Sequence, residues 1–332
     1  MQTVHADLIK GKKVLLRYDI DVPIQNGIVV DDFRLEAGLP TLKLCLENAS
    51  QVIILGHVGR PEGEDKKFSV APIYEWFKVH GYRPYFESNK LKLLENLRFE
   101  LGEDGCDPDY AKELASLGDV YINEAFAAYH KASSTTILPT LLPHAAGLHF
   151  AEEVEKLRRL RENPQKPFLA LIAGAKIGDK LEVIQVLAER ANAVLVGGKL
   201  ASQVHEDSFN FPHNVMAAHL TPDSLDISQH TIETWRPLLT HAAEIVWNGP
   251  VGKVESDGNS LPKSSKGTAE IAKILLGSKA EIIIGGGDTV GFLDKAGFLK
   301  RFQEKDSFIS AGGGAMLEFL TKGTLDTIEV LV

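Results

Sequence analysis

The sequence lacks the short motifs that usually identify a nucleotide-binding enzyme or a hydrolase. It contains neither a G-x-x-x-x-G-K-[ST] P-loop nor a G-x-G-x-x-G dinucleotide fingerprint. It also contains neither an H-R-D kinase triplet nor a G-x-S-x-G nucleophile elbow. The SSKGT segment (264–268) imitates a Walker motif only superficially. The classes of protein that those motifs define are therefore excluded.

Cysteines, long apolar runs and positive charge are also scarce. The 332 residues include two cysteines, Cys45 and Cys106, which give no disulfide framework and no metal-ligand spacing, as expected in the reducing cytoplasm. No run approaches the roughly 20 apolar residues of a membrane span, and the first residues lack the apolar core of a signal peptide. The net charge of −9 argues against a nucleic-acid partner. An anionic ligand must therefore be held by local positive clusters.

What the sequence does contain is a repeated pattern of strand, turn and helix. Short apolar runs predict strands at 13–19, 51–56, 91–96, 119–125, 168–174, 193–198, 243–249, 280–287 and 306–313. Stretches of helical period lie between most of them, at 34–49, 108–118, 180–191, 266–278 and 314–323. Continuous apolar strands that alternate with amphipathic helices predict α/β architecture, with parallel sheets covered on both faces.

The length of the chain predicts two domains. The segment 150–167 is charged and helix-prone and ends with prolines before a new strand, so we expect a helix there that joins the domains. This places an N-terminal domain at 1–152 and a C-terminal domain at 168–317. The region 202–242 is the least regular part, and we assign it loop and helix.

Arginine, histidine and acidic side chains follow the predicted strands of the first half. Ligands of open parallel sheets bind outside the carboxyl ends of the strands. The residues at those ends are Arg17, Asp19, Asp21, His57, Arg60, Arg98, Glu124, His130 and Lys131, and Arg34 follows a nearby turn. Guanidinium forks match carboxylate and phosphate groups. This half could therefore hold a small anion, although each arginine alone could equally form a salt bridge, and His57 alone could be structural.

The second half has glycine-rich turns instead, at 172–176, 196–199, 282–289 and 310–317, with Lys176, Lys180 and Lys199 nearby. Exposed backbone N–H groups and the helix dipole make such junctions anion sites. Asp288 directly follows one turn and is placed either to hold Mg²⁺ or to cap a helix. Two anion sites in one chain indicate phosphoryl transfer, in which positioning and charge neutralisation replace a general base when the attacking oxygen is already ionised.

These motifs, in this order, resemble those of the phosphoglycerate kinase family along nearly the whole chain. The matching strings are RYDIDVP, DDFR, GHVGRP, LLENLRF, DVYINEAF, KPFLALIAGAKIGDK, IVWNGPVG, IIIGGGDT and SAGGGAMLEFL. The resemblance implies two doubly wound parallel-sheet domains (Rossmann-like) that face each other across a cleft, with the tail 318–332 returning to the N-terminal domain. It also implies a cytoplasmic, monomeric, hinge-bending enzyme of glycolysis.

The reaction that the resemblance implies is reversible transfer of the acyl phosphate of 1,3-bisphosphoglycerate to Mg·ADP, which gives 3-phosphoglycerate and Mg·ATP. Its partners are then these small molecules, with Mg²⁺ and ATP or ADP. By motif, the phosphoglycerate site comprises Asp19, Asp21, Arg34, His57, Arg60, Arg98 and Lys131. The nucleotide site comprises Gly174, Lys176, Lys180, Glu255, Gly286, Gly287, Asp288 and Thr289, with Asp288 as the metal ligand. The groups that neutralise the moving phosphoryl group are Arg34, Lys176, Lys180, Gly312 and Gly313.

Several positions depart from the family pattern. The substrate-contacting Asn of the first motif is Asp21 here, which adds negative charge beside an anionic ligand. The arginine expected after His130 is Lys131, which keeps the charge but loses the bidentate fork. Lys199 replaces a glycine, and Lys253 replaces an apolar residue.

The chain is also shorter than its relatives between Glu87 and Leu91 and, more heavily, between Gln203 and Glu244, where relatives build part of the base pocket. The shortening and Lys131 motivate an alternative, a non-catalytic relative that binds a phosphometabolite or a protein partner. A third reading is a different small-molecule kinase on the same scaffold. The joint presence of Arg34, Lys180 and Asp288 favours the active phosphoglycerate kinase.

Overall fold

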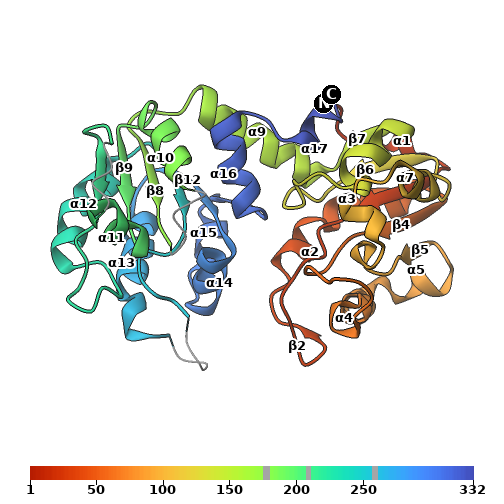
Figure 1. The fold of residues 1–332 in the computed structure, drawn as a ribbon, viewed down its shortest axis with the longest axis horizontal. Helices are drawn as coiled ribbons and strands as arrows, with labels where there is room; N and C mark the ends of the chain where they lie inside the picture. Colours follow the sequence, from red (N-terminus) through yellow and green to blue (C-terminus); the bar gives the residue numbers. More distant parts are fainter. Residues whose placement is uncertain (175–179, 207–210, 256–260) are drawn as a thin grey trace. The chain divides into compact units, whose positions relative to one another are not determined.

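The computed structural model describes residues 1–174, 180–206, 211–255 and 261–332. The chain divides into two compact units, which we call unit 1 (Met1–Glu155 with Thr324–Val332) and unit 2 (Lys156–Gly323). Each unit contains one parallel sheet flanked by helices (Figure 1). The predicted α/β fold class is therefore confirmed.

The sheet of unit 1 has five strands in the order β5-β4-β1-β6-β7, all parallel. They are β1 (Lys13–Arg17), β4 (Gln51–Leu55), β5 (Leu91–Leu93), β6 (Val120–Asn123) and β7 (His144–Ala146). The central strand β1 is apolar and fully buried after its first residue, because helices cover both faces of the sheet. A separate antiparallel hairpin is formed by β2 (Ile24–Gln25) and β3 (Ile28–Val29).

The helices of unit 1 lie between these strands. The α-helices are α1 (Ala6–Ile9), α2 (Phe33–Ala37), α3 (Leu39–Asn48), α4 (Ala71–Phe77), α5 (Arg83–Glu87), α6 (Leu101–Asp104), α7 (Pro108–Ala115), α8 (Leu138–Leu141) and α17 (Asp326–Glu329). Shorter or irregular turns are η1 (Lys66–Phe68), η2 (Lys78–Tyr82), η3 (Leu97–Phe99) and η4 (Ser133–Ile137). α17 comes from the end of the chain and packs on η4.

The sheet of unit 2 has six parallel strands in the order β10-β9-β8-β11-β12-β13. They are β8 (Phe168–Ile172), β9 (Ala193–Val196), β10 (Val215–Ala217), β11 (Glu244–Asn248), β12 (Glu281–Gly285) and β13 (Phe308–Ile309). The helices are α10 (Leu181–Ala188), α11 (Lys199–Glu206), α12 (Gln229–His241), η5 (Lys263–Ser265), α13 (Lys266–Gly277), α14 (Gly287–Lys295), α15 (Leu299–Glu304) and α16 (Gly313–Lys322). α10 packs against α16, and α12 packs against α13. Every residue of β8 and β11 is buried, as the apolar runs predict.

Both sheets start at a central strand, extend to one side and then return to add strands on the other side. In unit 1 the reversal lies between β1 and β6, and in unit 2 it lies between β8 and β11. Ligands of doubly wound folds bind at the carboxyl ends of the strands near such a reversal. The topology thus specifies one candidate site in each unit.

The structure differs from the sequence-based expectations in a few elements. The predicted helix 34–49 is two helices, α2 and α3, divided at Gly38, where a β-carbon would lie 2.5 Å from the Tyr18 ring. The sequence analysis did not predict β7 or β10, which are only three residues long. The irregular region 202–242 contains the strand β10 and the long helix α12.

The predicted helix at 150–167 is α9 (Leu148–Glu162), and the boundary between the units falls inside it. It ends early because Asn163 precedes Pro164, and a residue before proline avoids the helical conformation. The segment 318–323 continues α16 in unit 2, so the part of the tail that belongs to unit 1 starts at Thr324.

The start of α9 is held by buried ionisable groups. The carboxylate of Glu124 accepts the backbone N–H groups of His149 and Phe150, each at 3.2 Å. Burial raises the pKa of Glu124 to about 7, although the His149 charge and these hydrogen bonds oppose the shift. Burial disfavours the charged form of His149, but the hydrogen bond and charge of Glu153, 3.3 Å away, together with the Glu124 charge, raise its pKa to about 9.

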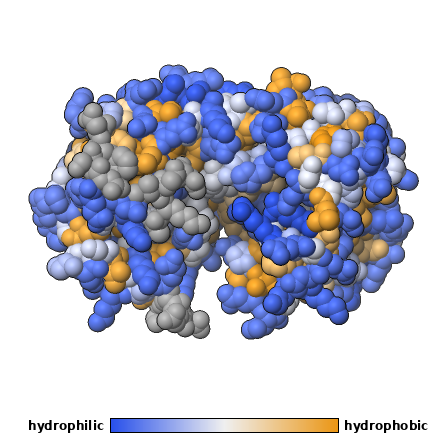
Figure 2. All heavy atoms as spheres, in the orientation of Figure 1, coloured by the Kyte–Doolittle hydropathy of each residue, from blue (hydrophilic) through white to orange (hydrophobic). Residues whose placement is uncertain are grey.

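No helix in the described ranges is both long enough and apolar enough to cross a membrane. On the face seen in Figure 2, hydrophilic residues predominate and hydrophobic residues form small, separate groups. The most exposed large hydrophobic side chains of unit 1 include Leu101, Val79 and Ile28, which come from three different elements. Such scattered apolar residues are normal for a protein surface.

We expect the protons that Glu124 and His149 bind in the folded state to lower the stability of the protein as the pH rises from about 4.5 to about 9, a contribution that the lowered pKa of His57 opposes below pH 6.5. The folded state holds a proton on Glu124 between the ordinary pKa of 4.5 and about 7, and on His149 between 6.5 and about 9. Since the folded state binds more protons than the unfolded state across both windows, raising the pH favours unfolding. The Glu124 contribution is on the order of 3 kcal/mol at most. Urea unfolding at a series of pH values measures it.

The Glu124→Gln variant should remove the Glu124 contribution between about pH 4.5 and 7, because the amide does not titrate, while its oxygen still accepts one of the hydrogen bonds. Glu113→Gln, on the exposed face of α7, is the matched control and should leave the dependence unchanged. A Glu124→Gln variant whose stability changes with pH in the same way as the wild type between about pH 4.5 and 7 would contradict the assignment.

Candidate active site

In unit 1, charged side chains gather at the carboxyl edge of the sheet. Asp19 and Asp21 follow β1, His57 follows β4, and Arg98 lies in η3 after β5. Parallel strands end at the same edge, which explains why residues far apart in the sequence meet there.

Arg34, in α2, reaches both acids of this cluster. Its Nη1 donates to the backbone oxygen of Asp21 at 2.8 Å and lies 3.7 Å from Oδ1 of Asp19. Asp19 is 5% exposed, and its burial raises the pKa of the carboxyl group, although the Arg34 charge opposes the shift. The side chain of Arg34 is 28% exposed and so remains accessible to a ligand.

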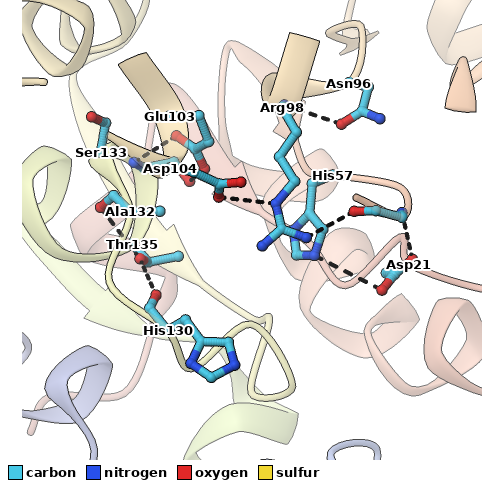
Figure 3. A network of polar contacts seen from close by, with 12 residues as sticks. Asp21, His57, Asn96, Arg98, Glu103, Asp104, His130, Ala132, Ser133 and Thr135 are labelled. Atoms are coloured by element: carbon cyan, nitrogen blue, oxygen red, sulfur yellow. Dashed lines mark hydrogen bonds and ion pairs between the residues drawn. The ribbon is translucent and has the colours of Figure 1, made fainter. Parts of the chain in front are cut away.

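Arg98 is held in place by three contacts (Figure 3). Its Nε donates to Asp104 at 3.0 Å, its Nη1 donates to the backbone oxygen of Gly59 at 2.8 Å, and its backbone N–H donates to Asn96. Gly59 in turn donates its N–H to Oδ1 of Asp21 at 2.8 Å. The turn that follows His57 therefore ties Arg98 and Asp21 into one cluster.

Asn96 organises this cluster, although the sequence analysis did not single it out. It is 2% exposed, and its amide group donates to the carbonyl oxygens of Val58 and Phe68 at 2.8 and 2.9 Å. Its Oδ1 accepts the N–H groups of Val58 and Arg98. The only sequence signal was an Asn inside the LLENLRF string. Asn96 thus joins the loop that carries His57 to the turn that carries Arg98.

Two of the predicted substrate residues, Lys131 and Arg60, form none of the contacts just described for the cluster around Arg34 and Arg98. Lys131 is 66% exposed, and its ammonium lies 3.5 Å from Asp326 in α17 of the same unit. Lys131 therefore faces an acid of the C-terminal segment. Arg60 is exposed, and its charge is among those that lower the pKa of His57.

Unit 2 contains a cavity of about 530 Å³ at the carboxyl edge of its sheet. The predicted nucleotide residues Gly174, Glu255 and Asp288 all line it. The other lining residues are Gly198, Lys199, Ser202, Gln203, Glu206, Asp223, Ser224, Leu225, Pro250, Gly252, Lys253 and Val254. The structure therefore brings together three of the predicted nucleotide residues from turns after β8, β11 and β12.

Lys180 lies beside this cavity. Its ammonium donates to the backbone oxygen of Ala173, and a β-carbon on Gly174 would lie 3.0 Å from it. Gly174 has φ +115°, a conformation that favours glycine. Lys176, which we predicted to neutralise the phosphoryl group, lies outside the described residues.

Two helix N-termini meet at the predicted phosphate turns. α14 begins at Gly287 and α16 begins at Gly313, so the first N–H groups of each have no partner within the helix. A β-carbon on Gly313 would lie 2.4 Å from the backbone of Gly286, so the two turns are in close contact. Gly312 caps α16. Positive helix ends that lie this close favour a polyanion.

Asn248 and Thr289 support these turns from inside. Asn248, at the end of β11, donates to the carbonyl oxygen of Gly313 at 3.3 Å and is 4% exposed. Thr289 is fully buried, and its hydroxyl accepts the N–H of Gly249 at 2.9 Å. Thr289 therefore supports the turn after β11 from within the protein. Asn248 belongs to the same site; the sequence analysis quoted the string that contains it but did not name it as a site residue.

Asp288 is the residue that could hold a metal. It lies in the first turn of α14 and lines the cavity. Among the described residues, no group of three or more His, Cys, Asp or Glu side chains could hold a metal by itself. One carboxylate beside a phosphate site nevertheless fits Mg²⁺, which is commonly bound by one or two carboxylates and by the phosphates of the substrate.

Comparisons with known proteins agree with this fold. The family model described as phosphoglycerate kinase matches residues 4–208 and 204–323. The phosphoglycerate kinase of Thermus thermophilus is 32% identical over 388 residues, which cover 97% of each chain. That of Leptospira biflexa is 33% identical over 390 residues, which cover 98% of this chain and 96% of the relative. Both alignments are longer than this chain, so these relatives carry segments that it lacks.

Solved structures show the same similarity. The phosphoglycerate kinase of Coxiella burnetii has a TM-score of 0.78 and 28% identity, and covers 97% of this chain and 96% of its own. That of Pyrococcus horikoshii has a TM-score of 0.82 over 100% of this chain and 98% of its own; at 24% identity it supports the fold alone.

The fold and the relatives place the chain among the phosphotransferases. The chain belongs to the phosphoglycerate kinase family. The resemblance seen in the sequence is therefore confirmed.

Asn96→Ala should destabilise unit 1 by about 1–3 kcal/mol, because it leaves buried partners of the amide without hydrogen bonds. Urea unfolding measures the loss. Asn48→Ala is the control, since the Asn48 side chain is only half-buried and its amide donates to Leu44 within the same helix, so its loss should cost much less. Equal losses in the two variants would show that Asn96 has no special role.

Proposed function

We propose that this chain catalyses reversible transfer of the acyl phosphate of 1,3-bisphosphoglycerate to Mg·ADP, giving 3-phosphoglycerate and Mg·ATP. The observation that carries the proposal is the pair of differently built anion sites, one in each unit of a phosphoglycerate kinase family member. The site of unit 1 consists of charged side chains, which suit a small ligand bearing carboxylate and phosphate groups. The site of unit 2 consists of a cavity beside two helix N-termini, which suits a nucleotide.

In this proposal Asp19, Asp21, Arg34, His57 and Arg98 bind the phosphoglycerate. Gly174, Glu255 and Asp288 bind the nucleotide, with the Gly286–Gly287 turn at its phosphates. Mg²⁺ bound with the nucleotide would be held by Asp288 and would neutralise phosphate charge. Lys180 and the Gly312–Gly313 turn would stabilise the negative charge of the phosphoryl group, by ammonium and backbone N–H groups respectively.

Transfer requires that the two bound ligands meet in the reacting complex. We propose that a hinge movement about α9, within which the unit boundary falls, brings this about and excludes water from the acyl phosphate. We also propose that the protein works as a monomer in the cytoplasm. Gel filtration at working concentrations would test the monomer.

One wall of the cavity that the base of the nucleotide would meet is polar. Lys199, Ser202, Gln203 and Glu206 lie on one face of α11, at helical spacing, and all line the cavity. Asp223 lines it as well. Activity assays should therefore compare ATP with GTP, since carboxylate and amide side chains can accept hydrogen bonds from the amino groups of either base.

Lys180→Ala should lower kcat at least 100-fold, because it removes one charge that stabilises the transferring group. The measurement is a coupled assay with 3-phosphoglycerate, ATP and Mg²⁺. Lys273→Ala is the matched control, since Lys273 forms an exposed ion pair with Glu270 in the same unit and should leave kcat unchanged.

The same assay separates the alternatives. Saturable binding of 3-phosphoglycerate by the wild-type protein without turnover would show a non-catalytic relative. Turnover only with another acceptor would show a different small-molecule kinase. Either outcome would overturn the proposed reaction.

Asp21→Asn should lower KM for 3-phosphoglycerate by about fivefold, since removing one like charge about 4 Å from an anion in a water-like environment is worth on the order of 1 kcal/mol. The Asn side chain can still accept the N–H of Gly59, so the turn is preserved. Asp7→Asn, at an exposed position of α1, makes the same change in net charge and should leave KM unaltered. A higher KM in the Asp21 variant would show that the site uses the carboxylate.

A further inference from the structure

Arg17 is a buried arginine that the proposed reaction does not use. It ends β1 and is 1% exposed. Its Nε donates to Oγ of Ser134 at 2.9 Å, its Nη1 donates to the carbonyl oxygen of Tyr18 at 3.1 Å, and its Nη2 contacts Nδ1 of His57 at 2.7 Å. The guanidinium is therefore fixed from three sides, and one N–H group points at the imidazole.

Ser134 and Glu103 anchor the other side of this guanidinium. Ser134 donates its hydroxyl to Oε1 of Glu103 at 2.5 Å and its backbone N–H to Oε2 at 3.0 Å. Because the hydroxyl has one proton, which goes to the carboxylate, its oxygen accepts from Arg17. Glu103 is 1% exposed, so a serine links two buried opposite charges. Figure 3 shows Glu103 beside the segment that begins at Ser133.

This arrangement decides which nitrogen of His57 carries the proton. An arginine only donates hydrogen bonds and stays charged, so Nδ1 of His57 must accept. The neutral ring then carries its proton on Nε2. Nε2 lies 3.9 Å from Oδ2 of Asp21, beyond an ordinary hydrogen bond, and the side chain of His57 is 12% exposed.

The surroundings of His57 also keep the ring neutral. Burial lowers its pKa well below the ordinary value of 6.5, and nearby positive charges lower it further. The charged groups that act on it or face it are Arg17 from β1, Arg98 from η3, Arg34 from α2, Arg60 from its own loop and Asp21 from the loop after β1. Asp21 is the only acid among these groups, and the four arginines outweigh it.

We propose that Arg17, held by Ser134 and Glu103, is a positioning residue that fixes His57 as the neutral tautomer donating from Nε2 into the anion site. The ring then contributes a directed N–H donor whose availability does not change with pH near neutrality. The inference rests on the proposed function only for the identity of the anion, 3-phosphoglycerate, and not for the state of the ring.

The test is ¹⁵N NMR of the histidine rings in the whole protein without ligand, with the His57 signal identified by its loss in His57→Gln. In the wild-type protein we expect Nε2 protonated, Nδ1 unprotonated and no titration between pH 6 and 8. A wild-type His57 that carries its proton on Nδ1, or that titrates near 6.5, would overturn the proposal whatever the variants do.

Arg17→Met should release the ring, which is then expected to mix both tautomers and to titrate nearer the ordinary value. Since this change leaves Glu103 buried without its partner, the double variant Arg17→Met with Glu103→Gln removes both charges and is more easily accommodated. Arg83→Met, which removes an exposed arginine of the same unit, is the control and should leave the His57 spectrum unchanged. An unchanged spectrum in both Arg17 variants would also overturn the proposal.

Kinetics supply a second readout. In the wild-type enzyme His57 should cause no change of KM for 3-phosphoglycerate between pH 6 and 8, because the ring does not titrate there. In the Arg17 variants it should rise with pH through the new pKa, because the cationic ring binds an anion better than the neutral one, while kcat changes less. Failure of the reaction itself would leave the NMR result standing, so the two proposals fail separately.

Discussion

The constraint on which this structure depends is that a parallel sheet buried on both faces can place charged groups only where its strands end. The interiors of β1, β8 and β11 are apolar and covered, because an unpaired polar side chain inside them would cost free energy. The buried charged residues of these strands, Arg17 and Glu244, lie at the last position of β1 and the first position of β11, and the candidate site residues follow the carboxyl ends of the strands, beside the point where the strand order reverses. Each unit acquires its candidate anion site for the same reason.

The two sites meet the same electrostatic problem in different ways. A chain with a net charge of −9 has to attract anions locally. Unit 1 does so with arginines whose positions are set by carbonyl oxygens and acids, as Arg98 is set by Gly59 and Asp104. Unit 2 does so with backbone N–H groups at the starts of α14 and α16 and with the Lys180 ammonium. Side chains suit a small, directional ligand, whereas helix ends suit the diffuse charge of phosphates.

The buried polar groups of unit 1 serve this arrangement rather than stability alone. Asn96 joins two loops through four hydrogen bonds, and Arg17 and Glu103 share Ser134. Burying such groups is costly unless every partner is supplied. Because the partners are supplied here, the side chains of the site are held in one geometry before a ligand binds.

Much of the fold followed from local pattern. The main strands were predictable because buried parallel strands are continuous apolar runs, and most of the helices because their period is regular. The candidate residues Asp19, His57, Asp288 and the glycine turns could be named because they directly follow those strands. The end of α9 could have been predicted from Pro164, whereas β7 and β10 are too short to leave a signal.

The amino-acid sequence by itself determined the fold class, the edge of each sheet where the candidate site residues lie, and the family. Only the tertiary structure decided the partners: that Lys131 faces Asp326, that Arg98 is held by Asp104, and that Arg17 reaches His57 and, through Ser134, Glu103. The physical reason is that strand and helix patterns arise from neighbours within a few residues. Hydrogen bonds between groups as far apart in the sequence as Arg17 and Ser134 exist only once packing has brought their elements together.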